Sequence, residues 1–130
     1  MLYIDTSAFL KLIVEEDHSK DLQRYLTNKE LWSSTLLGVE AHRAGLRLGI
    51  APTDIDLRLA FVTMFVPSET TFDTARLIGS ASLPALDAIH LSSAAELGGD
   101  LDALVTYDRR LREECLRIGM AVVAPGAAAL

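Results

Sequence analysis

The chain has few of the features that would mark it as secreted or membrane-bound. Its 130 residues include one cysteine, Cys115, so no internal disulfide can form, and we expect a reducing compartment. The longest uncharged stretch, residues 118–130, is interrupted by Gly and Pro and is too short to cross a bilayer. The first apolar segment carries Asp5 and lacks a positive flank, unlike a secretory signal. We therefore expect a soluble, cytoplasmic protein with no membrane segment.

Positive charge is also scarce. The chain has 12 Lys and Arg against 18 Asp and Glu, a formal net charge of -6, whereas proteins that bind nucleic acid through bulk charge are basic. Any contact with phosphate must therefore be local, through a basic patch or a bound cation. Half of the residues are hydrophobic and 23% are charged, which is typical of a compact core. We expect one domain over residues 1–130.

Short apolar segments alternate with longer amphipathic ones. The apolar segments predict strands over residues 2–5, 30–34, 64–67, 102–108 and 120–125. The segments between them carry helix start and stop signals and predict helices over residues 8–14, 18–28, 34–49, 51–64, 68–79, 83–99 and 108–119. Thr6 or Ser7 is the expected cap of the first helix. This alternation indicates an α/β protein with a parallel sheet covered on both faces.

Two acids follow predicted strands directly. Asp5 ends the first strand and Asp108 ends the fourth, and ligands of parallel sheets bind beyond the carboxyl ends of the strands. Both acids have a simpler interpretation, in which each only caps the helix that follows it. The sequence leaves both interpretations open.

Two further acids lie on apolar helix faces. Glu40 shares a face with Leu36, Leu37 and Ala44, by the spacing of helical turns. Asp87 is the only formally charged residue between residues 77 and 95, so we expect it to be partly buried. The alternatives are local: Glu40 would pair with Arg43 or Arg47, and Asp87 would bind the backbone amides that start its own helix.

If these four acids meet, their repulsion must be compensated. Two unit charges 4 Å apart repel by about 4 kcal/mol at an effective dielectric constant of about 20, and a whole domain is stable by about 5–15 kcal/mol. Protonation is one remedy, and a hard divalent cation with oxygen ligands is the other. No Lys or Arg neighbours Asp5 or Asp87 in the sequence. We therefore favour a bound Mg²⁺ or Mn²⁺, which would also serve phosphodiester hydrolysis.

Four blocks of sequence resemble the PIN-domain family, and especially its VapC-type toxins. They are "LYIDTSAFLKL", "GVEAHRAG", "LPALDAIHLSSA" and "LVTYDRRL", and they occur in the family's order along nearly the whole chain. The resemblance implies a three-layer α/β/α sandwich with a central parallel sheet, and magnesium-dependent hydrolysis of RNA. It implies that the catalytic, metal-binding acids are Asp5, Glu40, Asp87 and Asp108.

The resemblance also implies residues around the acids. Small hydroxyl residues near the metal correspond to Thr6, Ser7 and Thr106. His90 stands where many relatives carry a small apolar residue. Three residues after Asp87, it would either face the same cleft or pack as an ordinary helix histidine.

The resemblance further implies partners. They are an RNA substrate, a VapB-like antitoxin whose helical tail lies in a groove beside the site, and a second copy in a homodimer. Arg109 and Arg110 are candidate RNA contacts, or else form a solvated face paired with nearby Glu residues. Apolar candidates for the antitoxin groove, which would equally suit a core, are Phe9, Leu10, Leu36, Leu37, Leu46 and Leu48.

Two rival functions remain. One is a catalytically inactive PIN-like module that keeps the acids to dock a basic antitoxin helix. The other is a phosphoryl-transfer domain with Asp5 as nucleophile. Such domains usually carry a second acid two residues later and a late lysine. This chain has Ser7 at that place and no lysine after Lys29, so we rank this function last.

Overall fold

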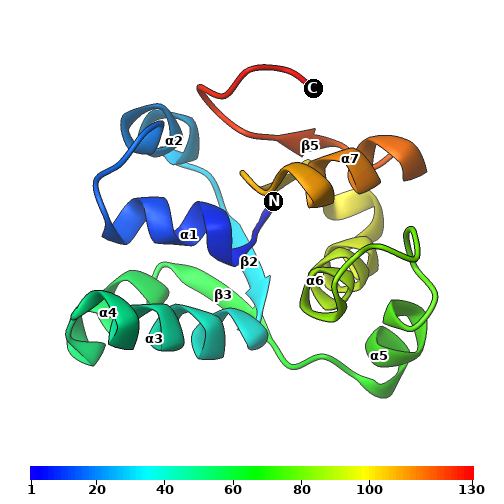
Figure 1. Ribbon diagram of the computed structural model, residues 1–130, viewed down its shortest axis with the longest axis horizontal. Helices are drawn as coiled ribbons and strands as arrows, with labels where there is room; N and C mark the ends of the chain where they lie inside the picture. The colour runs from blue at the N-terminus through cyan, green and yellow to red at the C-terminus, as the bar shows by residue number, and fades with distance from the viewer.

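The computed structural model describes residues 1–130, which form seven α-helices and five strands (Figure 1). In chain order the elements are β1 (Leu2–Ile4), α1 (Thr6–Ile13), α2 (Ser19–Leu26), β2 (Leu31–Ser34), α3 (Leu36–Leu48), α4 (Pro52–Leu59), β3 (Val62–Phe65), α5 (Glu69–Ala75), α6 (Ala85–Glu96), a 3₁₀ turn (Gly98–Asp100), β4 (Ala103–Val105), α7 (Arg109–Ile118) and β5 (Val122–Val123). None of these helices has the length and apolarity that a membrane crossing would require.

The five strands form one sheet in the order β3-β2-β1-β4-β5, and every pairing is parallel. The chain runs outward from β1 through β2 to β3, and then returns to add β4 on the other side of β1. Tyr3 of β1 lies opposite Trp32 of β2 and Leu104 of β4. The order of the strands therefore reverses between β1 and β4, which is where ligands of such sheets bind.

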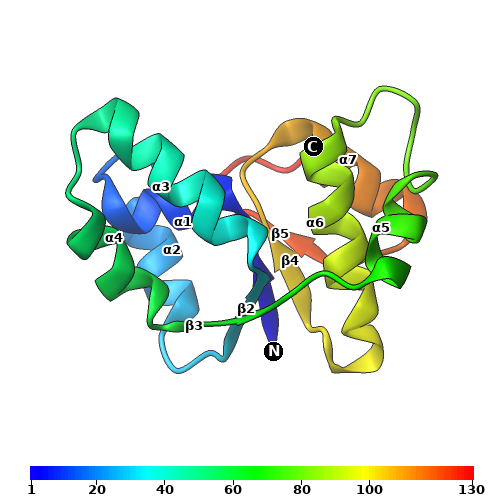
Figure 2. The ribbon, with the colours of Figure 1, turned by 90° about the horizontal axis from the view of Figure 1, so that it is seen from below.

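Side chains of the central strands alternate between two cores. Leu2 and Ile4 pack with residues of α1 to α4, whereas Tyr3 packs with residues of α6 and α7. The same alternation places Leu104 of β4 in the second core. Figure 2 shows the result, with α1 to α4 on one side of the sheet and α5 to α7 on the other. The three-layer α/β/α sandwich expected from the sequence is confirmed.

Most helices and strands are shorter than the sequence predicts, and two differences matter most. Asp5, and neither Thr6 nor Ser7, caps α1, because its carboxylate accepts a hydrogen bond from the Ala8 amide. Helix α4 ends at Leu59, well before residue 64, and β3 begins at Val62. The helix ends early because the apolar residues after it pair with β2. Val62 lies opposite Leu31 at the start of β2, so these residues form the edge strand of the sheet. The αL residue Gly49 ends α3 as predicted.

Candidate active site

The four predicted acids come from four places in the chain around the switch point of the sheet. Asp5 follows β1 and Asp108 precedes α7, while Glu40 and Asp87 lie in α3 and α6. Helix α3 begins after the carboxyl end of β2, and the first turn of α6 contains Asp87. The topology therefore brings acids that are widely spaced in the sequence to one edge of the sheet.

Asp5 is buried, with 3% of its surface exposed. One carboxylate oxygen accepts hydrogen bonds from Ser7 Oγ at 2.8 Å and from the Ala8 amide at 3.0 Å. The other accepts from Thr106 Oγ1 at 2.5 Å. Burial raises the pKa of Asp5, and the hydrogen bonds from Thr106, Ala8 and Ser7 only partly offset this. Asp5 is thus both a helix cap and a buried acid held between the ends of β1 and β4.

Glu40 makes neither of its predicted local ion pairs. Its Oε1 atom accepts hydrogen bonds from Thr6 Oγ1 at 2.7 Å and from His90 Nε2 at 2.6 Å. Burial acts to raise the pKa of Glu40, but the hydrogen bonds from His90 and Thr6 outweigh it, so the pKa is lowered. Glu40 is therefore a carboxylate fixed by partners from α1 and α6.

Asp87, like Asp5 and Asp108, forms no ion pair with a Lys or Arg side chain. It does not cap α6, whose N-cap residue is Pro84. Burial and then the negative charges of Asp108 and Asp5, with a smaller effect from Glu40, raise its pKa to about 6. The repulsion means that Asp87 shares one region with the other three acids.

Asp108 lies in an open cleft. Its Oδ1 atom accepts a hydrogen bond from the Leu111 amide at 2.9 Å and caps α7. The cleft has a volume of about 470 Å³ and is lined by Pro84, Asp87, Asp108, Arg109, Arg110 and Glu113. Arg109 pairs with Glu113 at 3.0 Å, as the solvated-face interpretation predicted, while Arg110 forms no ion pair. Two acids and a free guanidinium therefore border the same open space.

The donor set suits a hard cation, but the acids do not form a closed ligand cluster. No three His, Cys, Asp or Glu side chains lie close enough together to hold a metal ion between them. Asp87 still lies close enough to the other three acids for their charges to raise its pKa. Carboxylate oxygens without a Lys or Arg partner are nevertheless the ligands that Mg²⁺ and Mn²⁺ prefer.

Sequence reasoning missed the partners of His90. This ring is 2% exposed, and its Nδ1 atom lies 2.7 Å from the Tyr3 hydroxyl. The same hydroxyl accepts a hydrogen bond from the Ser34 amide at 3.2 Å. Burial by itself lowers the pKa of His90, but the Glu40 hydrogen bond and the nearby Tyr3 and Asp5 raise it to about 10. The sequence did carry one indication of this contact. Tyr3 lies in a strand predicted to be fully buried, and a buried hydroxyl needs a hydrogen-bond partner.

Comparison with known proteins agrees with this architecture. The PIN-domain family model matches residues 2–114. Three ribonucleases of Mycobacterium tuberculosis are similar over most of their length. VapC47 is 37% identical, with 98% of each chain covered. VapC46 is 40% identical over 95% of this chain and 97% of its own, and VapC35 is 40% identical over 98% and 99%.

Solved structures share the fold at lower identity. The M. tuberculosis toxin VapC20, described as cleaving the sarcin-ricin loop, superposes with a TM-score of 0.76 at 14% identity, covering 96% of this chain and 100% of that one. A toxin–antitoxin complex from Klebsiella pneumoniae gives a TM-score of 0.71 at 18% identity, covering 96% and 98%. By its sequence match, its relatives and its fold, the chain belongs to the PIN-domain family and to the VapC type within it.

Proposed function

We propose that this protein is a metal-dependent endoribonuclease and the toxin of a type II toxin–antitoxin pair, acting in the cytoplasm. The observation that carries the proposal is the group of four acids at the switch point, where Asp87 and Asp108 line one open cleft and Asp87 pairs with no Lys or Arg. The relatives named ribonuclease VapC support the reaction type.

Asp5, Glu40, Asp87 and Asp108 would hold Mg²⁺ or Mn²⁺. Such an ion would activate a water molecule for attack and would shield the charge of a phosphodiester. The chain's own hydroxyl groups keep the acids in place: Thr6 donates to Glu40, and Ser7 and Thr106 donate to Asp5. These hydrogen bonds orient the carboxylates and favour their ionised form, whereas burial favours the protonated form.

The cleft beside the acids is suited to a phosphate chain. Arg109 and Arg110 line it together with Asp87 and Asp108. Because the protein is acidic as a whole, these guanidinium groups are a local source of attraction for RNA. We propose that Arg110, which has no acidic partner, contacts a phosphate next to the scissile one.

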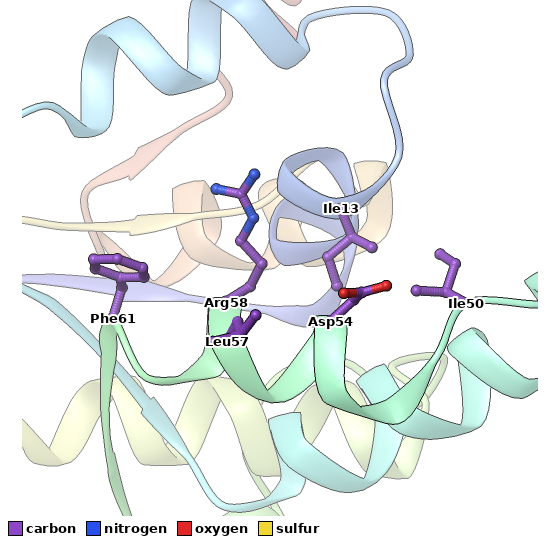
Figure 3. A pocket seen from close by; sticks show the side chains of 6 residues that line it. All are labelled: Ile13, Ile50, Asp54, Leu57, Arg58 and Phe61. Atoms are coloured by element: carbon purple, nitrogen blue, oxygen red, sulfur yellow. The ribbon is translucent and has the colours of Figure 1, made fainter.

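The antitoxin would cover an apolar pocket between α1 and α4 (Figure 3). The pocket has a volume of about 460 Å³ and is lined by Ile13, Ile50, Asp54, Leu57, Arg58 and Phe61. Leu57 is 67% exposed and Phe61 is 76% exposed, so a partner's apolar side chains would remove both from water. The predicted groove residues Phe9 and Leu37 are fully buried, so that part of the prediction was wrong: they belong to the core. The homodimer stays a prediction.

The test is RNA cleavage by protein purified free of its partner, in the presence of Mg²⁺ or Mn²⁺. We expect Asp5→Asn and Asp87→Asn to abolish cleavage while the protein stays folded, and EDTA to do the same to the wild type. Glu69→Gln, at an exposed acid in the first turn of α5, is the matched control and should cleave normally. Wild type that binds a basic antitoxin but cuts no RNA would contradict the proposal and favour the inactive docking module.

A further inference from the structure

A buried line of hydrogen bonds connects the backbone of β2 to Glu40. It runs from the Ser34 amide to the Tyr3 hydroxyl at 3.2 Å, from that hydroxyl to His90 Nδ1 at 2.7 Å, and from His90 Nε2 to Glu40 Oε1 at 2.6 Å. Tyr3 and His90 are almost completely buried, so water does not compete for these contacts. Each group in the line therefore depends on its neighbours for its hydrogen bonds.

The direction of these hydrogen bonds follows from their chemistry. A carboxylate only accepts hydrogen bonds, so His90 Nε2 must carry the hydrogen that it shares with Glu40. In a neutral imidazole Nδ1 is then the acceptor, and Tyr3 can supply its single hydroxyl hydrogen, because the Ser34 amide already donates to the Tyr3 oxygen. In the imidazolium both nitrogens donate, and Nε2 still donates to Glu40. The contact to Glu40 is thus the same in either charge state of the ring.

The ring has little freedom to leave this position. Tyr3 and His90 meet edge to face, with ring centroids 5.7 Å apart and an interplanar angle of 72°. On the other side, Thr6 Oγ1 donates to the same Glu40 oxygen as His90. Both donors reach Oε1, which leaves Oε2 without a hydrogen bond from the protein.

We propose that His90 is a positioning residue that fixes Glu40 with one oxygen presented to the site, and that Tyr3 fixes His90. This inference rests on the proposed ribonuclease function, because Glu40 matters only if the site binds metal and RNA. Partners that orient a metal-binding side chain in this way typically change affinity or activity by about 10–100-fold when they are removed.

Substitutions at His90 separate the two contacts. In His90→Gln the side-chain amide can reach the place of Nε2 and still donate to Glu40. In His90→Asn the amide reaches only the place of Nδ1, and His90→Leu loses both contacts. Tyr3→Phe keeps the packing and removes only the hydroxyl. The matched control is His42→Gln, because His42 lies on the same helix as Glu40 but its Nε2 atom contacts Asp56 of α4, at 2.8 Å.

Three measurements are made on each variant: Mn²⁺ affinity by calorimetry, kcat and KM for RNA cleavage, and thermal unfolding. We expect His90→Leu and His90→Asn to weaken Mn²⁺ binding and lower kcat by about 10–100-fold, with little change in KM. His90→Gln should restore most of the Mn²⁺ affinity and most of kcat. It should still unfold at a lower temperature than wild type, because it too lacks the acceptor for Tyr3. Tyr3→Phe should lie between wild type and His90→Leu, and His42→Gln should match wild type.

A spectroscopic measurement tests the contact without any activity. The chain has three histidines, so nitrogen-15 NMR of the metal-free wild type can resolve each imidazole, and we expect hydrogen on Nε2 of His90. Hydrogen on Nδ1 with a bare Nε2 would overturn the inference. So would a folded His90→Leu variant whose Mn²⁺ affinity and kcat equal those of an active wild type. A wild type that neither binds Mn²⁺ nor cuts RNA would instead overturn the proposed function.

Discussion

Thr106 Oγ1 donates a hydrogen bond of 2.5 Å to Asp5 Oδ2 and so joins the end of β4 to the end of β1. The same hydroxyl oxygen accepts a hydrogen bond from the Asp108 amide at 3.1 Å. One threonine therefore connects two of the four acids, and it does so at the point where the order of the strands reverses. Without this donor, the buried Asp5 carboxylate would lose a hydrogen bond that favours its ionised form.

The first prediction concerns this hydroxyl. Thr106→Val keeps the shape of the side chain but leaves Asp5 without its donor, so we expect the free energy of unfolding to fall by about 1–3 kcal/mol. Urea denaturation measures the change. Thr106→Ser retains the hydroxyl and should lose less. Thr63→Val, at an exposed position of the edge strand β3, is the control and should not destabilise. Equal effects at residues 63 and 106 would show that the hydrogen bond to Asp5 is unimportant.

The second prediction concerns charge repulsion at Asp87. Removing this charge in Asp87→Asn should stabilise the metal-free protein, because burial and the neighbouring acids raise the pKa of Asp87 to about 6. Since the side chain is partly exposed, solvent screening limits the gain to about 1 kcal/mol. Thermal unfolding in EDTA measures it, and Mn²⁺ should raise the unfolding temperature of the wild type but not of the variant. A variant less stable than wild type in EDTA would contradict the repulsion.

The sequence was sufficient to predict the five strands to within a few residues. Strands buried on both faces are continuous apolar segments, so β1 and β4 were visible. Asp5 follows β1 directly as predicted, whereas Asp108 lies three residues beyond the end of β4 at Val105. The boundary between α4 and β3 was not predictable, because the apolar run "LAFVTMF" fits either element. Only pairing with β2 decides that Val62 begins the strand.

The partner of Glu40 was beyond local reasoning. Helical spacing predicted Arg43 or Arg47 as the partner of Glu40. In the structure the partner is His90, which is 50 positions further along the chain. Parallel strands joined by helical crossovers create contacts of this kind, and only the packing of α3 and α6 against the sheet reveals them. The same holds for Tyr3 and His90, which are 87 positions apart.

A third prediction uses the single cysteine. The Cys115 thiol is fully buried, and burial, followed by the charges of Asp5 and Glu114, raises its pKa to about 12. We expect no alkylation by iodoacetamide in the native protein at pH 8 and full alkylation after unfolding in urea, read by mass spectrometry. Rapid labelling without denaturant would contradict the burial of Cys115.

The same thiol should make the stability of the protein fall as the pH rises in the alkaline range. The pKa is about 12 in the folded protein and 9.0 in the unfolded reference state, so the unfolded state loses this proton first. The contribution of the protonated Cys115 thiol to the free energy of unfolding is fully present below pH 9. It is lost as the pH rises from 9 towards 12. Cys115→Ala removes this dependence, and we expect its urea midpoint to fall less steeply than that of wild type between pH 9 and pH 11. Parallel curves would contradict the raised pKa.

A fourth prediction concerns the apolar pocket between α1 and α4. Leu57 and Phe61 are largely exposed, so Leu57→Ser and Phe61→Ser should change the free energy of unfolding by about 0.5 kcal/mol or less. If an antitoxin helix covers this pocket, each substitution should weaken the complex by about tenfold or more, because exposed aromatic and aliphatic anchors dominate such interfaces.

Co-purification with the tagged antitoxin from the same operon measures the loss. Leu116→Ser, at a comparably exposed leucine on α7, is the matched control and should bind normally. An antitoxin that binds all three variants equally would place its helix elsewhere on the protein.

A fifth prediction compares two glycines of α3. A Cβ atom at Gly45 would clash with Ile55 Cδ1 of α4, whereas a Cβ at Gly38 would meet nothing within 4 Å. Gly45→Ala should therefore push α3 and α4 apart around the buried Ile55, at a cost of about 1–3 kcal/mol. Gly38→Ala should stabilise the helix by about 0.5–1 kcal/mol, because alanine loses less backbone entropy than glycine. Urea denaturation of both variants measures the two changes in the free energy of unfolding, which should have opposite signs.

The clash can be tested by relieving it. Ile55→Val removes the Cδ1 atom that a Gly45→Ala methyl group would strike, so the double variant should be more stable than the sum of the two single effects predicts. Strict additivity, or a Gly45→Ala variant as stable as Gly38→Ala, would mean that α4 moves freely against α3. In that case the apolar pocket beside α4 would not have a fixed shape, and a partner helix would have to order it on binding.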